Sequence, residues 1–126
     1  MKKPQIIYVE NEQDDVDLLR RMLEKSEIDA DLISAPNEQQ FVSELTERCP
    51  DLVLSDNKIP GFGALNALRL TREKCGDVSF ICVSGLVPEK EERVLREAGA
   101  LCCLSKDNLI VVAAAIREAL SARAHS

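Results

Sequence analysis

Five short apolar runs, separated by longer amphipathic segments, are the feature that most constrains the fold of this chain. The runs cover residues 6–9, 30–35, 52–54, 80–83 and 101–104. Runs of this length, rich in branched side chains, are typical of strands that are buried on both faces of a parallel sheet. Between them, apolar residues recur at helical spacing. The sequence therefore predicts an α/β fold in which strand and helix alternate five times.

The alternation also predicts the topology and the position of a site. Right-handed crossovers with helices on both faces favour a doubly wound, five-stranded parallel sheet in the order 2-1-3-4-5, which is flavodoxin-like. Ligands of such sheets bind at the carboxyl ends of the strands, beside the switch point between strands 1 and 3. We therefore expect Glu10 and Asn11, after the first strand, to meet Asp56, after the third, with Ser84 and Lys106 beside them.

Capping residues mark the expected helix boundaries. Asn37 is expected to cap the second helix, while Pro88 opens the fourth helix and Gly99 ends it. Asp107 or Asn108 is expected to cap the last helix. The segment 60–63 (PGFG) is expected to form a loop, and the pattern shows no linker between domains.

Length and charge limit the classes of protein to which the chain can belong. The 126 residues suit a single domain over 1–126, with a core at about 4–120 and a tail at 121–126. The net charge of −6, without a basic run, argues against a nucleic-acid partner. No stretch approaches the ~20 apolar residues of a membrane helix, and the acidic start excludes a signal peptide. We expect a cytoplasmic protein with no membrane partner.

The cysteines are expected to be reduced and structural. The chain has five, an odd number, and no C-x-x-C pair. Cys82, Cys102 and Cys103 lie in apolar runs, where free cysteine behaves as a small hydrophobic residue. The adjacent Cys102 and Cys103 should point to opposite faces of a strand. Since the one histidine, His125, lies in the tail, a zinc site would need scattered thiols, and we expect none.

The residues expected at the strand ends are suited to phosphoryl chemistry. An aspartate such as Asp56 is ionised at neutral pH and can act as a nucleophile without a general base. Lys106 can neutralise one phosphoryl oxygen, and Ser84 can donate a hydrogen bond to another. Each residue alone is more often a turn or cap residue, or a solvated charge. Their convergence on one point is what favours a functional site.

Six segments at the strand ends form a characteristic set: 9–12 (VENE), 51–56 (DLVLSD), 60–61 (PG), 83–85 (VSG), 99–100 (GA) and Lys106. The set resembles the receiver domain of two-component response regulators. The resemblance implies the receiver fold, with Asp56 as the phosphoacceptor, Ser84 as the switch hydroxyl and Lys106 as the lysine that contacts the phosphoryl group. It also implies that a sensor histidine kinase or a histidine phosphotransfer protein donates the phosphoryl group from a phosphohistidine.

The resemblance also implies a Mg²⁺ site, from which this sequence departs. Its ligands would be Glu10, Asn11, Asp56 and the backbone carbonyl of Lys58. Asn11 replaces the second acid of the family and brings no charge, and Lys58 is a candidate pocket cation. With Lys58 turned inward, the two carboxylates and two lysines of this pocket have a net charge of zero. The usual receiver pocket, with three carboxylates and one lysine, has a net charge of −2. The sequence therefore predicts a Mg²⁺ site that is weak or dispensable.

Three interpretations of function follow. The first is phosphorylation of Asp56, with Lys58 partly replacing the charge of the metal. The second is a degenerate receiver that acts as a phosphorylation-independent protein-interaction module. The third and least favoured is an aspartate-nucleophile phosphatase, because Asp56-Asn57-Lys58 lacks the second acid of a D-x-D motif. We expect no enzyme with turnover, only phosphoryl transfer onto the chain itself.

The output is expected to depend on a partner protein. The receiver resemblance occupies essentially the whole chain, which leaves no predicted output domain. The last helix carries Ile110 and Val111 beside its core stripe, and we expect a docking face formed by the fourth helix, the fifth strand and the fifth helix. Close packing of that helix on the sheet is the alternative. Cys103 stands where receivers usually carry Tyr or Phe, so a smaller conformational response is expected.

Overall fold

The computed structural model describes residues 3–124 of the chain. Five parallel strands form one sheet in the order β2-β1-β3-β4-β5, which confirms the predicted fold class and topology. The strands are β1 (Gln5–Val9), β2 (Asp31–Ala35), β3 (Leu52–Ser55), β4 (Ser79–Ser84) and β5 (Cys102–Ser105). The helices are α1 (Gln13–Lys25), α2 (Glu38–Glu47), α3 (Ala64–Cys75), α4 (Glu89–Glu97) and α5 (Leu109–Ala124).

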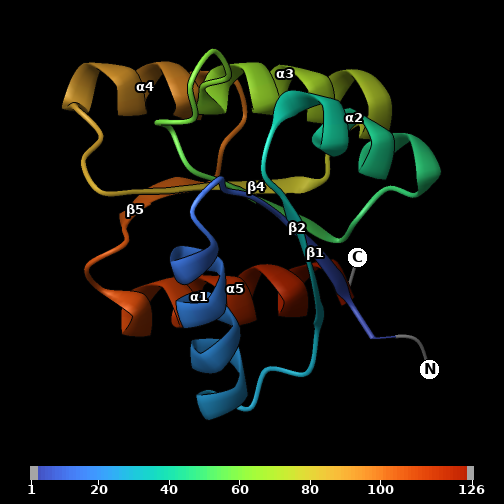
Figure 1. Cartoon of the computed structure of the whole chain (residues 1–126), viewed down its shortest axis with the longest axis vertical. Helices are drawn as coiled ribbons and strands as arrows, with labels where there is room; N and C mark the ends of the chain where they lie inside the picture. The colour runs from blue at the N-terminus through green and yellow to red at the C-terminus, as the bar shows by residue number, and fades with distance from the viewer. Residues whose placement is uncertain (1–2, 125–126) are drawn as a thin grey trace.

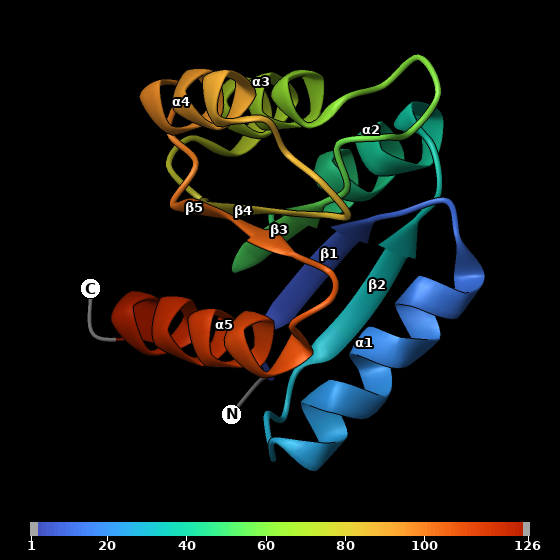
Figure 2. The same ribbon diagram turned by 90° about the vertical axis from the view of Figure 1, so that its left-hand side faces the viewer.

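The helices form two layers, one on each face of the sheet. Figures 1 and 2 show α2, α3 and α4 over one face and α1 and α5 over the other. The central strands alternate between these layers: Ile7 and Val9 of β1 pack toward α2 and α3, whereas Ile6 and Tyr8 pack toward α1 and α5. All four residues are almost completely buried. Burial on both faces explains why the strand sequences are continuously apolar.

The strand register brings the carboxyl ends of the central strands to one edge of the sheet. Val9 of β1 lies opposite Ser55 of β3, and Ser84 of β4 lies opposite Ser105 of β5. The backbone hydrogen bonds between β1 and β3, and those between β4 and β5, continue for one residue beyond the strands. The backbone N–H of Asp56 donates to Val9 O (2.9 Å), and that of Lys106 donates to Ser84 O (3.0 Å). The backbone therefore holds the residues after each strand before any side-chain contact forms.

The helix ends follow the predicted caps. The side chain of Asn37 accepts a hydrogen bond from the Gln40 N–H (2.9 Å), and that of Asn108 accepts one from the Val111 N–H (3.3 Å). Gly99 follows α4 with a φ of 117°, in the left-handed region that favours glycine. Helix α5 extends to Ala124, beyond the expected core end at 120, while residues 125–126, including His125, lie outside the described part.

Two cysteines are joined by a disulfide, which corrects the expectation of reduced thiols for this pair. Cys49, between α2 and β3, is bonded to Cys75 at the end of α3, with a Cα–Cα distance of 5.6 Å. The two residues are 26 positions apart, and they meet because α2 and α3 pack side by side. Cys82, Cys102 and Cys103 are free. Cys102 and Cys103 face opposite layers, as predicted.

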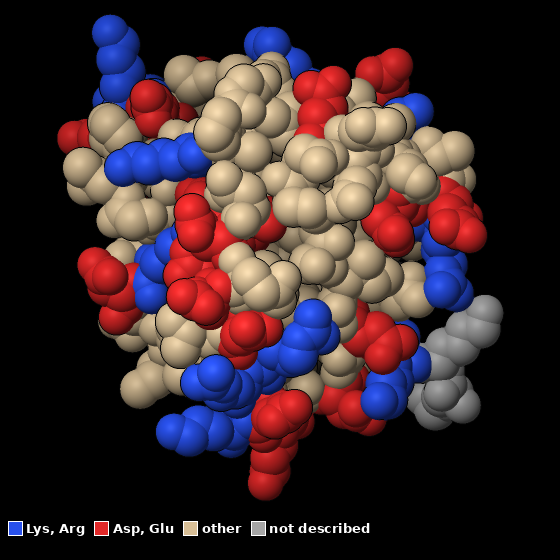
Figure 3. All heavy atoms as spheres, in the orientation of Figure 1, with Lys and Arg blue, Asp and Glu red and all other residues tan. Residues whose placement is uncertain are grey.

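The surface carries both signs of charge. Figure 3 shows Lys and Arg side chains interspersed with Asp and Glu on the face that it presents. Within residues 3–124, none of the helices combines the length and the apolar character needed to cross a membrane.

Candidate functional site

Asp56 lies directly after β3, at the sheet edge where the strands end. The residue is 5% exposed. Its Oδ1 accepts hydrogen bonds from Ser84 Oγ (2.9 Å) and from the backbone N–H of Lys58 (3.2 Å). Its Oδ2 lies 3.2 Å from Lys106 Nζ. The structure therefore brings together the acid, the hydroxyl and the lysine that the sequence places after three different strands.

Lys106 contacts three carboxylates at once. Besides Asp56, its ammonium forms ion pairs with Glu10, at the end of β1, and with Asp15, in the first turn of α1. The separation between Lys106 Nζ and Asp15 Oδ2 is 2.7 Å. Sequence reasoning did not identify Asp15. The sequence signal was its place in the first turn of α1, the helix that follows the end of β1.

Glu10 is the most buried acid of the site, with 1% of the residue exposed. Oε1 accepts a hydrogen bond from the Tyr8 hydroxyl (3.2 Å), and Oε2 accepts one from the backbone N–H of Glu12 (3.2 Å). Burial raises the pKa of Glu10, and Lys106 opposes this shift. Burial and the neighbouring Glu10 carboxylate likewise raise the pKa of Tyr8, so the phenol stays a hydrogen-bond donor.

The electrostatics keep Asp56 and Lys106 ionised. Burial acts to raise the pKa of Asp56, but the charge of Lys106 and the hydrogen bond from Ser84 hold this pKa below its ordinary value. Burial acts to lower the pKa of Lys106, but the Asp15 and Glu10 carboxylates raise it above the ordinary lysine value. The site therefore presents a carboxylate nucleophile beside a permanent positive charge.

The two residues that depart from the family pattern lie at the rim. The side chains of Asn11 and Lys58 are exposed, and Lys58 reaches Asp56 only through its backbone N–H. Among residues 3–124, the ammonium within ion-pair distance of Asp56 is that of Lys106. The site charges are therefore Glu10, Asp15 and Asp56 against Lys106, a net −2, and the neutral sum considered from the sequence does not describe this arrangement.

The donor set suits a hard cation in its chemistry. The carboxylates of Glu10 and Asp56, the amide of Asn11 and the carbonyl of Lys58 are all oxygen donors, which Mg²⁺ prefers. In the described part of the chain, no three Asp, Glu, His or Cys side chains are already arranged around a metal position. Instead, the acids converge on the ammonium of Lys106. A divalent cation would therefore share these carboxylates with the lysine.

Asn57 links the site to α4. Its Oδ1 accepts a hydrogen bond from the backbone N–H of Ala64 (3.1 Å), and its Nδ2 donates to Glu91 Oε2 (3.0 Å). Beside this link, a cavity of 560 Å³ opens between α3 and α4, lined partly by the apolar side chains of Leu65 and Val94. The residue after Asp56 thus joins the start of α3 to the first turn of α4.

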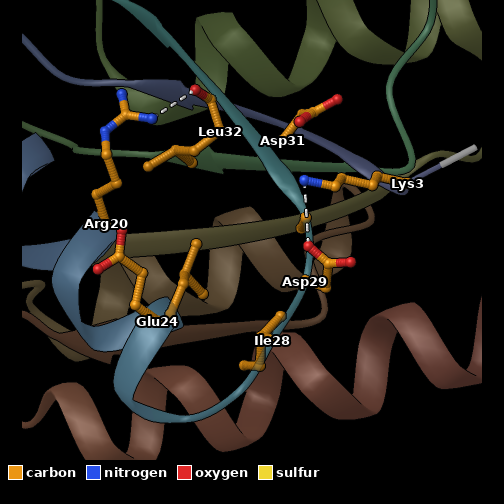
Figure 4. A pocket seen from close by; sticks show the side chains of 9 residues that line it. Lys3, Arg20, Glu24, Ile28, Asp29, Asp31 and Leu32 are labelled. Atoms are coloured by element: carbon orange, nitrogen blue, oxygen red, sulfur yellow. Dashed lines mark hydrogen bonds and ion pairs between the residues drawn. The ribbon is translucent and has the colours of Figure 1, made fainter.

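A second cavity, of 320 Å³, lies at the opposite end of the sheet (Figure 4). Two of its basic side chains already have partners. Lys3 Nζ lies 3.3 Å from Asp29 Oδ1, and Arg20 donates to the backbone carbonyl of Leu32 (3.1 Å). None of these residues follows the carboxyl end of a strand, so the chemistry of the molecule is concentrated around Asp56.

Comparison with known proteins gives one family. The family model described as the response regulator receiver domain matches residues 6–117. A solved response regulator from Thermotoga maritima is similar, with 25% identity, a TM-score of 0.83 and coverage of 95% of this chain and 99% of that chain. None of the curated proteins matches the chain.

Two further solved structures share the fold at lower identity. A CheY-like receiver domain protein from Methanospirillum hungatei JF-1 has 18% identity and a TM-score of 0.87, with 98% of each chain covered. A receiver domain protein from Clostridium thermocellum has 20% identity and a TM-score of 0.84, with coverage of 95% of this chain and 96% of that chain.

Proposed function

Because this chain belongs to the response regulator receiver domain family of two-component signal transduction, we propose that it accepts a phosphoryl group on Asp56 and signals by docking to a partner protein. The donor is a phosphohistidine of a sensor histidine kinase or a phosphotransfer protein, and the transfer takes place in the cytoplasm. The observation that carries the proposal is the convergence of Ser84 Oγ and Lys106 Nζ on the two oxygens of the Asp56 carboxylate.

The site supports direct transfer without a general base. An Asp56 oxygen attacks phosphorus, a P–O bond forms and the P–N bond to the imidazole of the donor breaks. The leaving imidazole nitrogen keeps the bonding electron pair and takes a proton from solvent. Lys106 neutralises charge on the phosphoryl oxygens, and the hydroxyl of Ser84, which now donates to Asp56 Oδ1, turns to donate to one of them.

A Mg²⁺ ion would add further charge neutralisation on the transferring phosphoryl oxygens. The residues that would hold it are Glu10, Asn11, Asp56 and the carbonyl of Lys58. Of these, Glu10 is already oriented by Tyr8 and by the backbone of the following turn. The chain's own contribution is therefore a cluster of acids held in position at the ends of β1 and β3.

Labelling with a small phosphodonor tests the proposal. Incubation with phosphoramidate over a Mg²⁺ titration should add one phosphoryl group, which intact-mass spectrometry detects. Its removal by hydroxylamine, which cleaves a mixed anhydride, assigns the product to an acyl phosphate. Asp56→Asn should abolish the labelling. Asp107→Asn, an exposed acid at the same edge of the sheet, is the matched control and should label like the parent. Labelling of Asp56→Asn at the parent rate would overturn the proposal.

Lys58→Ala separates two ways in which the site could work. If the ammonium of Lys58 replaced the metal charge, this variant would lose labelling that occurs without Mg²⁺. Since the side chain is exposed and only its backbone N–H reaches Asp56, we expect Lys58→Ala to label at the parent rate at every Mg²⁺ concentration. The measurement is the initial rate of acyl-phosphate formation.

A phosphorylation-independent interaction module is the second candidate, and the uncharged, exposed Asn11 favours it. Receiver domains are generally signalling modules and not catalysts. Failure of Asp56 to label at any Mg²⁺ concentration, together with unchanged partner binding by Asp56→Asn, would select this candidate. Turnover of a generic phosphomonoester would instead select a phosphatase.

A further inference from the structure

Two aspartates, Asp15 and Asp56, contact the ammonium of Lys106, and Asp15 lies closer to it. Its Oδ2 lies 2.7 Å from Lys106 Nζ, against 3.2 Å for Asp56 Oδ2. Asp15 and Lys106 are 91 positions apart, so the contact is a product of the fold. Both side chains are largely screened from solvent: that of Asp15 is 32% exposed and that of Lys106 is 19% exposed. The contact therefore acts in a medium less polar than water.

The position of Asp15 in a helix does not account for this contact. Asp14 and Asp15 both lie in the first turn of α1, where either carboxylate would favour the positive end of the helix dipole. Asp14 is exposed and forms no ion pair within the described chain. Asp15 is turned toward the sheet edge, where its charge is shared with Glu10 and Asp56 through one ammonium. The two neighbours thus form a natural pair for comparison.

The charge of Asp15 matches a deficit at the end of β1. Asn11, which follows Glu10, is neutral and exposed, and the side chain of Glu12 is exposed, so the strand end supplies one buried carboxylate. Asp56 supplies the second and Asp15 the third, and Lys106 offsets one of them. The resulting −2 is complementary to a divalent cation, although the third acid comes from a helix and not from the strand end.

Resting on the function proposed above, we propose that Asp15 is a positioning residue of the phosphorylation site: it holds the ammonium of Lys106 and supplies the negative charge that Asn11 lacks. By sharing Lys106, Asp15 limits the pairing of that lysine with the Asp56 nucleophile. By keeping the site at −2, it favours the binding of Mg²⁺ next to Glu10 and Asp56.

Calorimetric titration with Mg²⁺ alone tests this role without any phosphodonor. Asp15→Asn, which keeps the shape of the side chain but removes its charge, should weaken Mg²⁺ binding by about tenfold, the scale expected for one partly screened charge near the ion. Asp14→Asn removes the same charge from the same helical turn and should leave the affinity unchanged. Equal affinities of Asp15→Asn and Asp14→Asn, or no measurable Mg²⁺ binding by the parent chain, would overturn the inference.

A rescue variant distinguishes a charge role from a structural role. Asn11→Asp, added to Asp15→Asn, restores the third carboxylate from the strand end and should recover most of the lost affinity. If Asp15 only stabilised the structure of α1, a carboxylate added at position 11 would not restore the Mg²⁺ affinity. If Asp15→Asn fails to fold, the pair Asp15→Glu and Asp15→Gln decides, since the two differ only in charge and only the first should keep the affinity.

The outcome is separable from that of the proposed function. If the parent chain labels on Asp56 but Asp15→Asn binds Mg²⁺ as tightly as Asp14→Asn does, the role of Asp15 is wrong and phosphorylation stands. If the Mg²⁺ affinities differ as expected but the parent chain never labels, the charge role stands and phosphoryl acceptance is wrong.

Discussion

Glu10 couples the stability of the fold to pH, because the folded chain buries it. Burial raises its pKa above the ordinary 4.5, while Lys106 opposes the shift only in part. Between 4.5 and the raised value, the folded state binds more protons than the unfolded chain does. The free energy of unfolding therefore falls as the pH rises through this range. Asp56 has the opposite effect at lower pH, because its pKa in the folded chain lies below the ordinary 3.8. Its contribution to the free energy of unfolding is fully present above pH 3.8 and is lost as the pH falls through the lowered pKa.

Glu10→Gln should remove this fall in stability. In Mg²⁺-free buffer, urea unfolding of the parent chain from pH 4.5 to neutral pH should show a declining free energy of unfolding, and the variant should show a flatter profile. Glu12→Gln is the matched control, since the Glu12 side chain is exposed and only its backbone N–H contacts Glu10. A decline in Glu10→Gln as steep as in the parent would assign the pH dependence to another group.

At the scale of single residues, the sequence predicted the site residues at the strand ends but not the one that lies on a helix. Asp56, Ser84 and Lys106 lie at the carboxyl ends of strands that must share an edge, so topology alone predicts their meeting. The presence of Asp15 in the sequence is already explained by its position in the first turn of a helix, where acids favour the helix dipole. Its contact with Lys106 depends on the rotation of α1 about its own axis, which is set by tertiary packing. The sequence pattern does not specify that rotation to within one side chain.

Helix α5 differs from the other helices because its first eight residues, 109–116, are all apolar. Val112 and Ile116 are fully buried against the sheet, whereas Ile110 is 75% exposed and Val111 is 44% exposed. Leu101, just before β5, is also exposed. The alternative of close packing therefore does not account for Ile110, which lies free for the proposed docking face.

Ile110→Asp should keep the fold and lose the partner. Because the side chain is exposed, we expect the free energy of unfolding in urea to change by less than about 0.5 kcal/mol. Val112→Asp, on the buried side of the same helix, should cost more than about 3 kcal/mol, because it buries an unpaired charge. Binding of the cognate partner should weaken in Ile110→Asp. Destabilisation as large as that of Val112→Asp would contradict the orientation of α5.

At the scale of elements, the predictions succeeded where one local interaction decides the boundary. The caps at Asn37 and Asn108 each depend on one side chain and the next turn of its own helix, and both form as expected. Helix α5 continues to Ala124, because residues 121–124 contain no stop signal such as glycine or proline. Whether the exposed apolar side chains of α5 form a docking face could be predicted only as one of two alternatives, since periodicity cannot orient a stretch such as 109–116 in which every residue is apolar.

For the whole molecule, the unexpected feature is the covalent link between α2 and α3. The Cys49–Cys75 bond joins the segment before β3 to the end of α3, at the opposite end of the sheet from Asp56. The sequence could not predict this pair, because spacing in an odd set of five cysteines does not identify partners. Only the packing of α2 against α3 brings the two residues together.

Reduction of this bond should lower stability without affecting the site. A disulfide that closes a loop of this length restricts the unfolded chain, so Cys49→Ser, or reduction of the parent, should lower the free energy of unfolding by about 3 kcal/mol. Urea unfolding with and without a reductant measures the change. Cys103→Ser, which removes a free thiol and keeps the disulfide, is the control in which the reductant should still lower the free energy of unfolding.

Labelling of Asp56 should persist in Cys49→Ser at urea concentrations below the unfolding transition of this variant. Helix α3 begins at the site, but the disulfide holds only the far end of α3. Loss of labelling in a folded Cys49→Ser would mean that the link between α2 and α3 also holds the geometry of the site.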